Sequence, residues 1–277
     1  MDKLYFGTAG IPLSTKGKGT PAGIRRVKEL GLGAMELEFV RGVHMKEPTA
    51  EEVDKVRKET GIKLTCHAPY YVNLNSEEKA KVEASKKRIF ESARIANICG
   101  ATSVTFHAAF YQKQDSEKVY KNVKKELEEI IKTLRKDGND IEIRPELTGK
   151  ATQFGNLDEL IRLSQDIEGV LPCIDFAHMF ARTGKFNSYV EFMSMLEKIE
   201  VSLGKKALQN MHCHVSGIEF TEKGERRHLE MPDSDFHYLD LAKAFKDSGM
   251  RGIVISESPN IELDALLMKK LYGQSAR

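Results

Sequence analysis

Short runs of β-branched and aromatic residues alternate along the chain with longer segments whose apolar residues recur at helical spacing. Eight such pairs follow one another. The pattern predicts strands at 4–7, 34–39, 63–68, 103–107, 142–147, 170–175, 210–216 and 252–256. It predicts helices at 21–30, 49–60, 77–99, 116–136, 156–164, 187–203, 235–248 and 261–272. Because a helix follows every strand, we expect the strands to be parallel.

The number of these units predicts the fold class. Eight β-then-α units in 277 residues, with no long linker between them, favour an α/β protein built as one (β/α)8 TIM barrel. We therefore expect residues 1–277 to form a single domain. An open, doubly wound sheet is the alternative, but no G-x-G-x-x-G motif follows the first predicted strand.

The composition narrows the class of protein. Hydrophobic residues make up 40% of the chain and charged residues 30%, with a formal net charge of +2. This balance is typical of a globular protein and unlike that of a strongly basic nucleic-acid binder, although a local basic rim remains compatible with it. No apolar run approaches the ~20 residues that span a membrane. The N-terminus lacks the features of a secretory signal, and the four cysteines form no CxxC pair. We expect a cytoplasmic protein with reduced thiols.

Residues that bind metals concentrate at the ends of the predicted strands. They are His67, His107, Glu146, Asp175 with His178 three residues on, His214 and Glu257. Taken singly, each of these would more often be a structural histidine or the ion-pair partner of a basic residue such as Arg144. In a barrel, however, all strand C-termini meet at one rim, so six successive strands would place these groups in one pocket. His212, two residues before His214, would lie deeper and serve packing or support.

This mixture of ligands indicates which metals would bind. Imidazole and carboxylate together suit zinc, with manganese or iron as alternatives. One zinc ion takes about four or five ligands. The set is larger than that, so the sequence predicts two or three ions for each chain.

The same residues carry a resemblance to a known family. The segments are CHAPYYVNL at 66–74, FH at 106–107, PELTG at 145–149, CIDFAHMFA at 173–181, HVS at 214–216 and ESPN at 257–260. Together they resemble the endonuclease IV family of apurinic/apyrimidinic endonucleases, within the xylose isomerase-like barrels. The resemblance covers the chain from Cys66 to Asn260 and is looser before that.

The resemblance implies three zinc sites. The first would use His67, His107 and Glu146; the second would use Glu146, Asp175, His214 and Glu257. His178 would help to hold a third ion with a D-x-H pair, and here the chain departs from the family. In GERRHL at 224–229, His228 takes the histidine position, Arg226 stands where the family has Asp, and Glu225 is one residue out of register. We hypothesise that Arg226 replaces the third cation by donating to a phosphate oxygen; the alternative is a solvated arginine.

The implied activity is hydrolysis of the phosphodiester 5′ to an abasic site in double-stranded DNA. Two metal ions could act on the attacking and leaving oxygens together; Glu146 would bridge the pair, and Glu257 would orient the water. Arg41 and Tyr70 lie where the family inserts side chains into DNA; the alternatives are a solvated arginine and a packed tyrosine. No partner protein is indicated, and we expect a monomer.

Two other functions compete with this one. A sugar isomerase or epimerase on the same barrel needs one metal, and Glu146, Asp175, His214 and Glu257 also resemble its ligand set. Such an enzyme does not need His67, His107 and His178 together, so His178 discriminates between the two. A binding protein that has lost catalysis is the third alternative, favoured only by Arg226.

Overall fold

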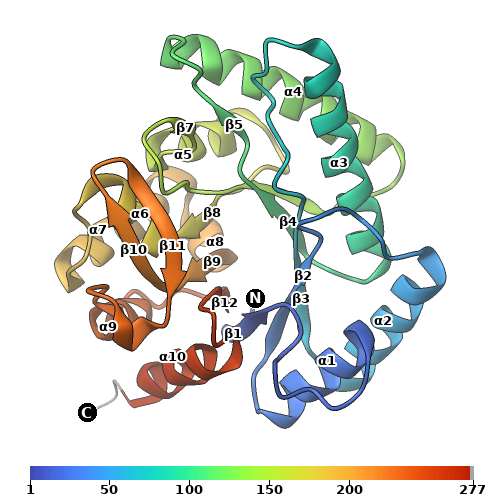
Figure 1. The fold of residues 1–277 in the computed structure, drawn as a ribbon, viewed down its shortest axis with the longest axis vertical. Coiled ribbons are helices and arrows are strands. Elements are labelled where there is room, and N and C mark those ends of the chain that lie inside the picture. Colours follow the sequence, from blue (N-terminus) through green and yellow to red (C-terminus); the bar gives the residue numbers. More distant parts are fainter. Residues whose placement is uncertain (275–277) are drawn as a thin grey trace.

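Eight parallel strands, one from each predicted unit, form a single sheet in the computed structural model, which describes residues 1–274 (Figure 1). Their order is β6-β4-β3-β2-β1-β12-β9-β8, and two parallel bridges, Ile143–Val170 and Glu146–Cys173, join the outer strands. The sheet therefore closes into the expected (β/α)8 barrel. The strands are β1 Leu4–Ala9, β2 Ala34–Glu38, β3 Lys63–His67, β4 Ser103–Phe106, β6 Glu142–Pro145, β8 Cys173–Asp175, β9 Met211–Val215 and β12 Gly252–Ser256.

Helices surround the barrel, as the view along its axis shows (Figure 1). They are α1 Gly19–Glu29, α2 Glu47–Thr60, α3 Lys79–Ile98, α4 Ser116–Lys136, α5 Leu157–Asp166, α7 Tyr189–Leu203, α9 Tyr238–Asp247 and α10 Glu262–Gln274. Each buries one apolar stripe against the strands; in α4 that stripe includes Val119, Val123 and Leu127. Helices cover the outer face of the strands, and side chains pack inside the barrel on the inner face. The strands are therefore buried along almost their whole length.

The predicted strand at 170–175 is shorter in the structure, where β8 covers only Cys173–Asp175. Pro172 has no N–H to donate, so it interrupts the ladder just before this strand. The buried Arg144 of β6 contacts this interruption: it donates to the carbonyl of Pro172 and pairs with Glu142 at 2.7 Å. Arg144 is thus a partner of Glu142, and not of Glu146 or Glu257.

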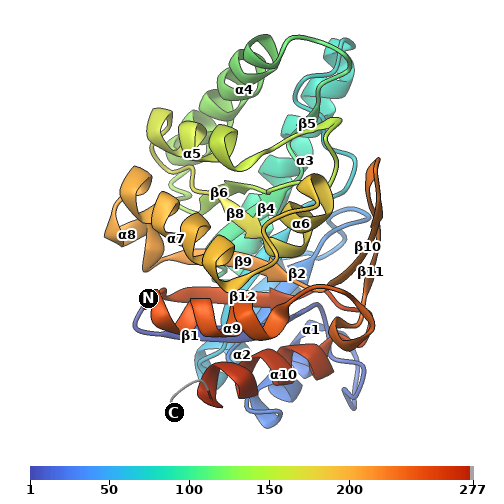
Figure 2. The ribbon, with the colours of Figure 1, turned by 90° about the vertical axis from the view of Figure 1, so that its left-hand side faces the viewer.

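Several elements were not predicted. They are α6 Phe176–Thr183, α8 Lys205–Leu208, the 3-10 turn Met231–Asp233, the short pair β5 Ala109–Phe110 and β7 Gln153–Phe154, and the hairpin of β10 Gly217–Thr221 with β11 Gly224–Leu229. The prediction of a loop at 224–229 was wrong, since this segment is an antiparallel strand. Figure 2 shows the hairpin standing beyond the ends of β9 and β12, beside the barrel mouth.

No helix among residues 1–274 is long and apolar enough to cross a membrane, as the sequence predicts.

Candidate metal centre

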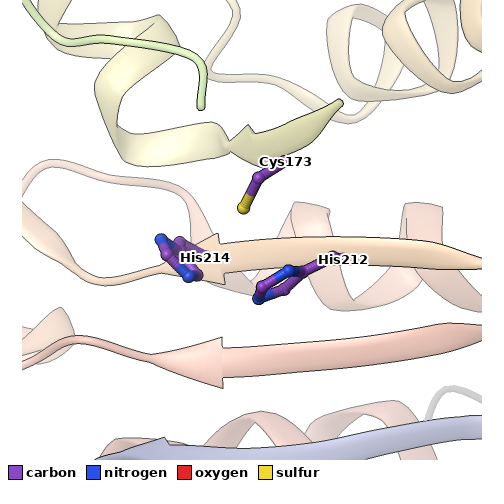
Figure 3. Close-up of side chains that lie close together, drawn as sticks. All are labelled: Cys173, His212 and His214. Atoms are coloured by element: carbon purple, nitrogen blue, oxygen red, sulfur yellow. The ribbon is translucent and has the colours of Figure 1, made fainter. Parts of the chain in front are cut away.

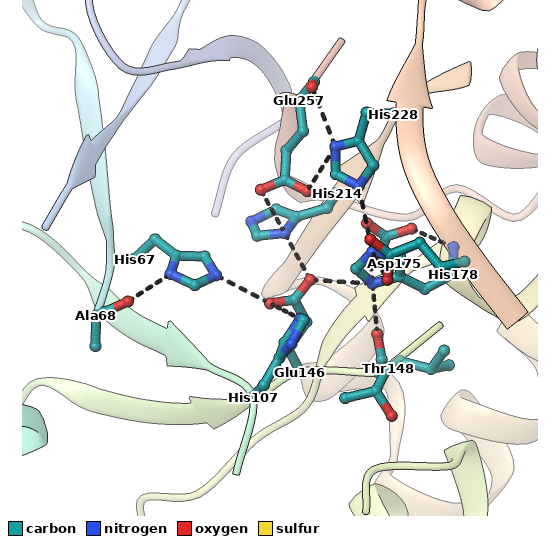
Figure 4. A network of polar contacts seen from close by, with 12 residues as sticks. His67, Ala68, His107, Glu146, Thr148, Asp175, His178, His214, His228 and Glu257 are labelled. Carbon is teal, nitrogen blue, oxygen red and sulfur yellow. Dashed lines mark hydrogen bonds and ion pairs between the residues drawn. The ribbon is translucent and has the colours of Figure 1, made fainter. Parts of the chain in front are cut away.

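The structure brings the predicted ligands together at one end of the barrel (Figure 4). His67 is the last residue of β3, Asp175 is the last residue of β8, and His214 lies near the end of β9. His107, Glu146 and Glu257 directly follow β4, β6 and β12. Because side chains alternate along a strand, these positions face the interior at the C-terminal rim, where a barrel gathers chemistry from distant segments.

Glu146 lies at the centre of the cluster and is fully buried. Its carboxylate contacts four imidazole rings at once. One oxygen lies 3.2 Å from His67 Nε2 and 3.3 Å from His107 Nε2; the other lies 3.1 Å from His214 Nδ1 and 3.4 Å from His178 Nδ1. A single carboxylate between four histidines is poorly suited to holding them in place by hydrogen bonds alone, since several of these contacts are long.

The spacing fits the ligand shell of a divalent metal. With Zn–N and Zn–O bonds of about 2.1 Å, two tetrahedral ligand atoms lie about 3.4 Å apart. The contacts of Glu146 with His67, His107 and His214 lie between 3.1 and 3.3 Å. Three groups at this rim each have ligand atoms within 4.8 Å of one another: His67, His107, Glu146; Glu146, Asp175, His214, Glu257; and Asp175, His178, His228.

The first two groups contain the same residues as the first two ligand sets that the family resemblance implies. A further group, Cys173 with His212 and His214, lies deeper inside the barrel (Figure 3). Burial raises the pKa of the Cys173 thiol to about 12 in the metal-free protein. Rim residues such as His67, His107 and Glu257 line the cavity at the barrel mouth, whereas Cys173, His212 and His214 do not.

The pKa values of the clustered carboxylates and histidines depart from their usual ranges because the groups are buried together. Burial alone would raise the pKa of Glu146, but the surrounding histidines, His107 and His214 foremost, hold it well below its usual range. Burial opposes protonation of His67, yet contact with Glu146 raises its pKa to about 10. Burial raises the pKa of Asp175. Without metal, the site thus takes up protons in place of cations.

Backbone carbonyls orient three of the histidines. The Nδ1 atoms of His67 and His178 lie 2.7 Å from the Ala68 carbonyl and 3.0 Å from the Leu147 carbonyl. The Nδ1 of His228 lies 3.2 Å from the carbonyl of Glu257. An N–H at each Nδ1 would satisfy the carbonyl and leave Nε2 free to bind a metal. His228 Nε2 and His178 Nε2 lie 3.3 Å apart, as two ligands of one ion would.

A β-bulge decides which residue of β11 joins this pair. Glu219 pairs with Arg227 and Phe220 pairs with Glu225, so Arg226 is an extra residue in the ladder. The bulge turns Glu225 and His228 to the same face, although alternation alone would separate them. Glu225 Oε2 lies 3.5 Å from His178 Nε2. The bulge therefore places the Glu225 carboxylate beside His178, although Glu225 is one residue out of register in the sequence.

Arg226 lies elsewhere. Its guanidinium pairs with Glu219 at 2.6 Å, and the side chain is 62% exposed. It lines a neighbouring groove with Lys150 and Lys223, not the cavity that holds the histidines. The bulge thus directs Arg226 outward, away from the histidines.

Gly149 lets the hairpin approach the ligands. A Cβ at this position would lie 2.7 Å from Glu225 Cβ and 3.1 Å from His178 Cδ2. The carbonyl of Gly149 accepts a hydrogen bond from the Glu225 amide at 3.1 Å. A larger residue would push Glu225 away from His178, so this glycine is needed for close approach rather than for flexibility.

Two acidic residues were missed by the sequence analysis. Glu36 is fully buried inside the barrel, and Glu38 ends β2 directly beside His67 of β3. Burial, with Glu36 and then Glu257 among the neighbouring charges, raises the pKa of Glu38 to about 8. Its buried Oε1 has no hydrogen-bond partner within residues 1–274. The signal was in the sequence AMELEF, where two carboxylates at a spacing of two interrupt an apolar strand.

The cluster opens into a cavity of about 390 Å³ at the barrel mouth. Its lining residues are His67, Tyr70, His107, Glu146, Lys150, Gln153, His178, Glu225, His228 and Glu257. The Tyr70 ring lies 5.7 Å from that of His67, and the residue is 62% exposed. Arg41, in the loop after β2, is exposed and outside this cavity lining.

Comparison with known proteins places the chain among its relatives. It is 44% identical over 272 residues to an uncharacterized protein of Methanocaldococcus jannaschii, covering 98% of this chain and 97% of that one. It is 24% identical over 216 residues to a probable endonuclease 4 of Aquifex aeolicus, covering 73% and 74% of the two chains.

Solved structures share the fold at low identity. The endonuclease IV of Thermus thermophilus superposes with a TM-score of 0.73 at 20% identity, covering 97% of this chain and 98% of that one. A D-tagatose 3-epimerase-like protein also has a TM-score of 0.73, at 16% identity and with 97% and 96% covered. The family model described as xylose isomerase-like TIM barrel matches residues 24–275. The chain therefore belongs to the xylose isomerase-like TIM barrel family.

Proposed function

We propose that this protein is a metal-dependent phosphodiesterase that cuts double-stranded DNA on the 5′ side of an abasic site. The observation that carries the proposal is the set of four imidazoles around Glu146, extended by His228 and Glu225. One ion cannot use so many ligands, whereas two or three closely spaced ions are suited to a phosphodiester and its leaving oxygen.

The residues would divide among the ions as follows. His67, His107 and Glu146 hold the first; Glu146, Asp175, His214 and Glu257 hold the second. For the third we propose His178 and His228 with Glu225, in place of the Asp of the resembling family. Zinc suits these ligands, with manganese or iron as alternatives. When bound, the ions neutralise the charge of the phosphodiester and lower the pKa of water.

The protein's own residues orient the reactants. Glu257, with a side chain that is 13% exposed, lies at the cavity wall and can accept a hydrogen bond from the attacking water. Tyr70 presents an aromatic face above His67 for stacking next to the lesion. Arg41, Lys150 and the outward-facing Arg226 can contact phosphates of the DNA backbone. In this proposal Arg226 positions DNA rather than taking part in catalysis.

The names of two relatives support DNA as the substrate. The similar proteins of Aquifex aeolicus and Thermus thermophilus are a probable endonuclease 4 and an endonuclease IV. We further propose that the protein acts as a monomer in the cytoplasm, which size-exclusion chromatography and cell fractionation would test.

A sugar epimerase is the second candidate. The group of Glu146, Asp175, His214 and Glu257 would suffice for its single metal, and the fold superposes equally well on a D-tagatose 3-epimerase-like protein. The extra histidines argue against it, because an epimerase has no use for His67, His107 and His178 together.

The experiment compares both reactions with the same protein. Zinc-loaded protein is incubated, with and without a chelator, with duplex DNA that carries one abasic site, with undamaged duplex, and with a panel of ketoses. We expect chelator-sensitive nicking 5′ to the lesion only. A His178→Asn variant separates the candidates further, since it should abolish nicking but leave single-metal epimerase activity intact. Turnover of a ketose without nicking, retained in H178N, would overturn the proposal.

A further inference from the structure

His214 is oriented opposite to the other histidines of the centre. His67, His178 and His228 direct Nδ1 to a backbone carbonyl, whereas the Nδ1 of His214 faces the ligands. It lies 3.1 Å from Glu146 and 3.4 Å from Glu257. Its Nε2 points away from them, toward another buried group in the barrel interior.

That group is Glu36. One carboxylate oxygen lies 2.8 Å from His214 Nε2, and the other lies 2.9 Å from His212 Nε2. Glu36 and His214 are fully buried, and His212 is almost fully buried. These contacts lack hydrogen-bond angles, and none of the four atoms has a hydrogen-bond partner within residues 1–274. Glu36 comes from β2 and the histidines from β9, so the contact crosses the barrel interior past β1 and β12.

The short distances from Glu36 to both rings indicate where the protons lie. A carboxylate oxygen 2.8 or 2.9 Å from Nε2 would repel an unprotonated nitrogen, so both histidines are assigned a proton on Nε2. At the other side of His212, Nδ1 lies 3.2 Å from the hydroxyl of Ser103, which can donate to it. Figure 3 shows that His212 and His214 project from the same face of β9.

We propose that Glu36 is a positioning residue of the metal centre: it keeps the proton of His214 on Nε2 and leaves Nδ1 free to bind metal between Glu146 and Glu257. Partners of this kind fix the tautomer and orientation of a ligating histidine, and their loss costs about 10- to 100-fold in metal affinity. The inference rests on the metal centre of the proposed function but not on its DNA substrate.

A substitution at Glu36 tests the proton assignment. In Glu36→Gln, one carbonyl oxygen must serve two N–H groups, and the amide NH2 faces the second histidine. We expect the zinc affinity of the most affected site to fall by about 10- to 100-fold in competition with a chelator. Ser103→Ala, a buried change at the far side of His212, is the matched control and should leave zinc affinity unchanged. An E36Q protein that binds zinc as tightly as the wild type would overturn the proposal.

A second variant separates positioning from packing. In the pair E36Q with His212→Leu, the amide no longer faces a second N–H, so its carbonyl can turn to His214 and part of the zinc affinity should return. A packing role predicts instead that the double variant binds no better than E36Q, which would contradict the proposal.

The wild-type protein provides an independent readout. Histidine-labelled protein loaded with cadmium, studied by ¹⁵N NMR, should show His214 coordinating through Nδ1 with a proton on Nε2. His67 should show the reverse. The same arrangement in both rings would overturn the proposal even if E36Q failed to fold. A protein that passes these tests but does not nick abasic DNA would refute the proposed substrate and leave the role of Glu36 intact.

Discussion

Replacing Glu225 with Gln removes a single negative charge from the group around His178 and His228. The Glu225 side chain is only 18% exposed, and its oxygen lies 3.5 Å from His178 Nε2. Two unit charges about 4 Å apart interact by about 4 kcal/mol at an effective dielectric constant of 20. Because water can replace part of this interaction, we expect a loss of about 2–4 kcal/mol, or about 30- to 1,000-fold in affinity for one ion.

The neighbouring residue is the matched control. Arg226→Gln changes a charge one position away, but that side chain faces solvent and pairs with Glu219. Solvent screens such a pair, so its loss should hardly affect metal binding. Both variants are dialysed against a weak chelator, and the zinc content of each chain is measured by mass spectrometry. We expect three ions in the wild type and in R226Q, and two in E225Q.

The opposite pattern would refute the reasoning. If E225Q kept three ions, or if R226Q lost one, then the bulge in β11 would not determine the third ligand. Two ions in the wild type would restore the hypothesis in which Arg226 stands for the third cation. Nicking of abasic DNA by the same samples shows whether the third ion matters for activity.

Three further predictions concern pH and DNA binding. Contact with Glu146 raises the pKa of His67 to about 10, so a metal ion must displace the proton of this histidine. Zinc affinity should therefore rise with pH between about 6 and 9. Competition titrations at several pH values test this, and a flat profile would contradict it. Burial raises the pKa of Glu38 to about 8, from about 4.5 in the unfolded chain. The folding stability of the metal-free protein should therefore fall as pH rises from about 4.5 to about 8. In urea unfolding, the stability of Glu38→Gln should depend less on pH, and an equal pH dependence in both proteins would contradict this prediction. Tyr70→Ala should weaken binding to abasic duplex by about 1–3 kcal/mol. Arg41→Ala should lower the salt dependence of DNA binding by about one phosphate contact. Fluorescence anisotropy measures both effects, and unchanged binding in both variants would show that these residues lie outside the DNA interface.

Local sequence determined most of the barrel. The ends of α4 and β12 coincide with the predicted segments 116–136 and 252–256, because amphipathic spacing and apolar β-branched runs act over a few residues. The hairpin β10–β11 was missed, since its strands are only five and six residues long and β11 is rich in charged residues. Such strands are stabilised by pairing with each other and by packing on α6, which no local pattern reveals.

The ligands themselves could be predicted because parallel strands that close into a barrel must end at one rim. The sequence thus predicted the barrel and the meeting of these residues at one rim, and the family resemblance implied their division into two groups that share Glu146. Tertiary structure decided the rest. The extra residue in β11 turned Glu225 toward His178 and Arg226 toward solvent, and barrel closure placed Glu36 against His214 from across the interior. Local periodicity contains neither the bulge nor the contact across the barrel, since both depend on how distant segments pack.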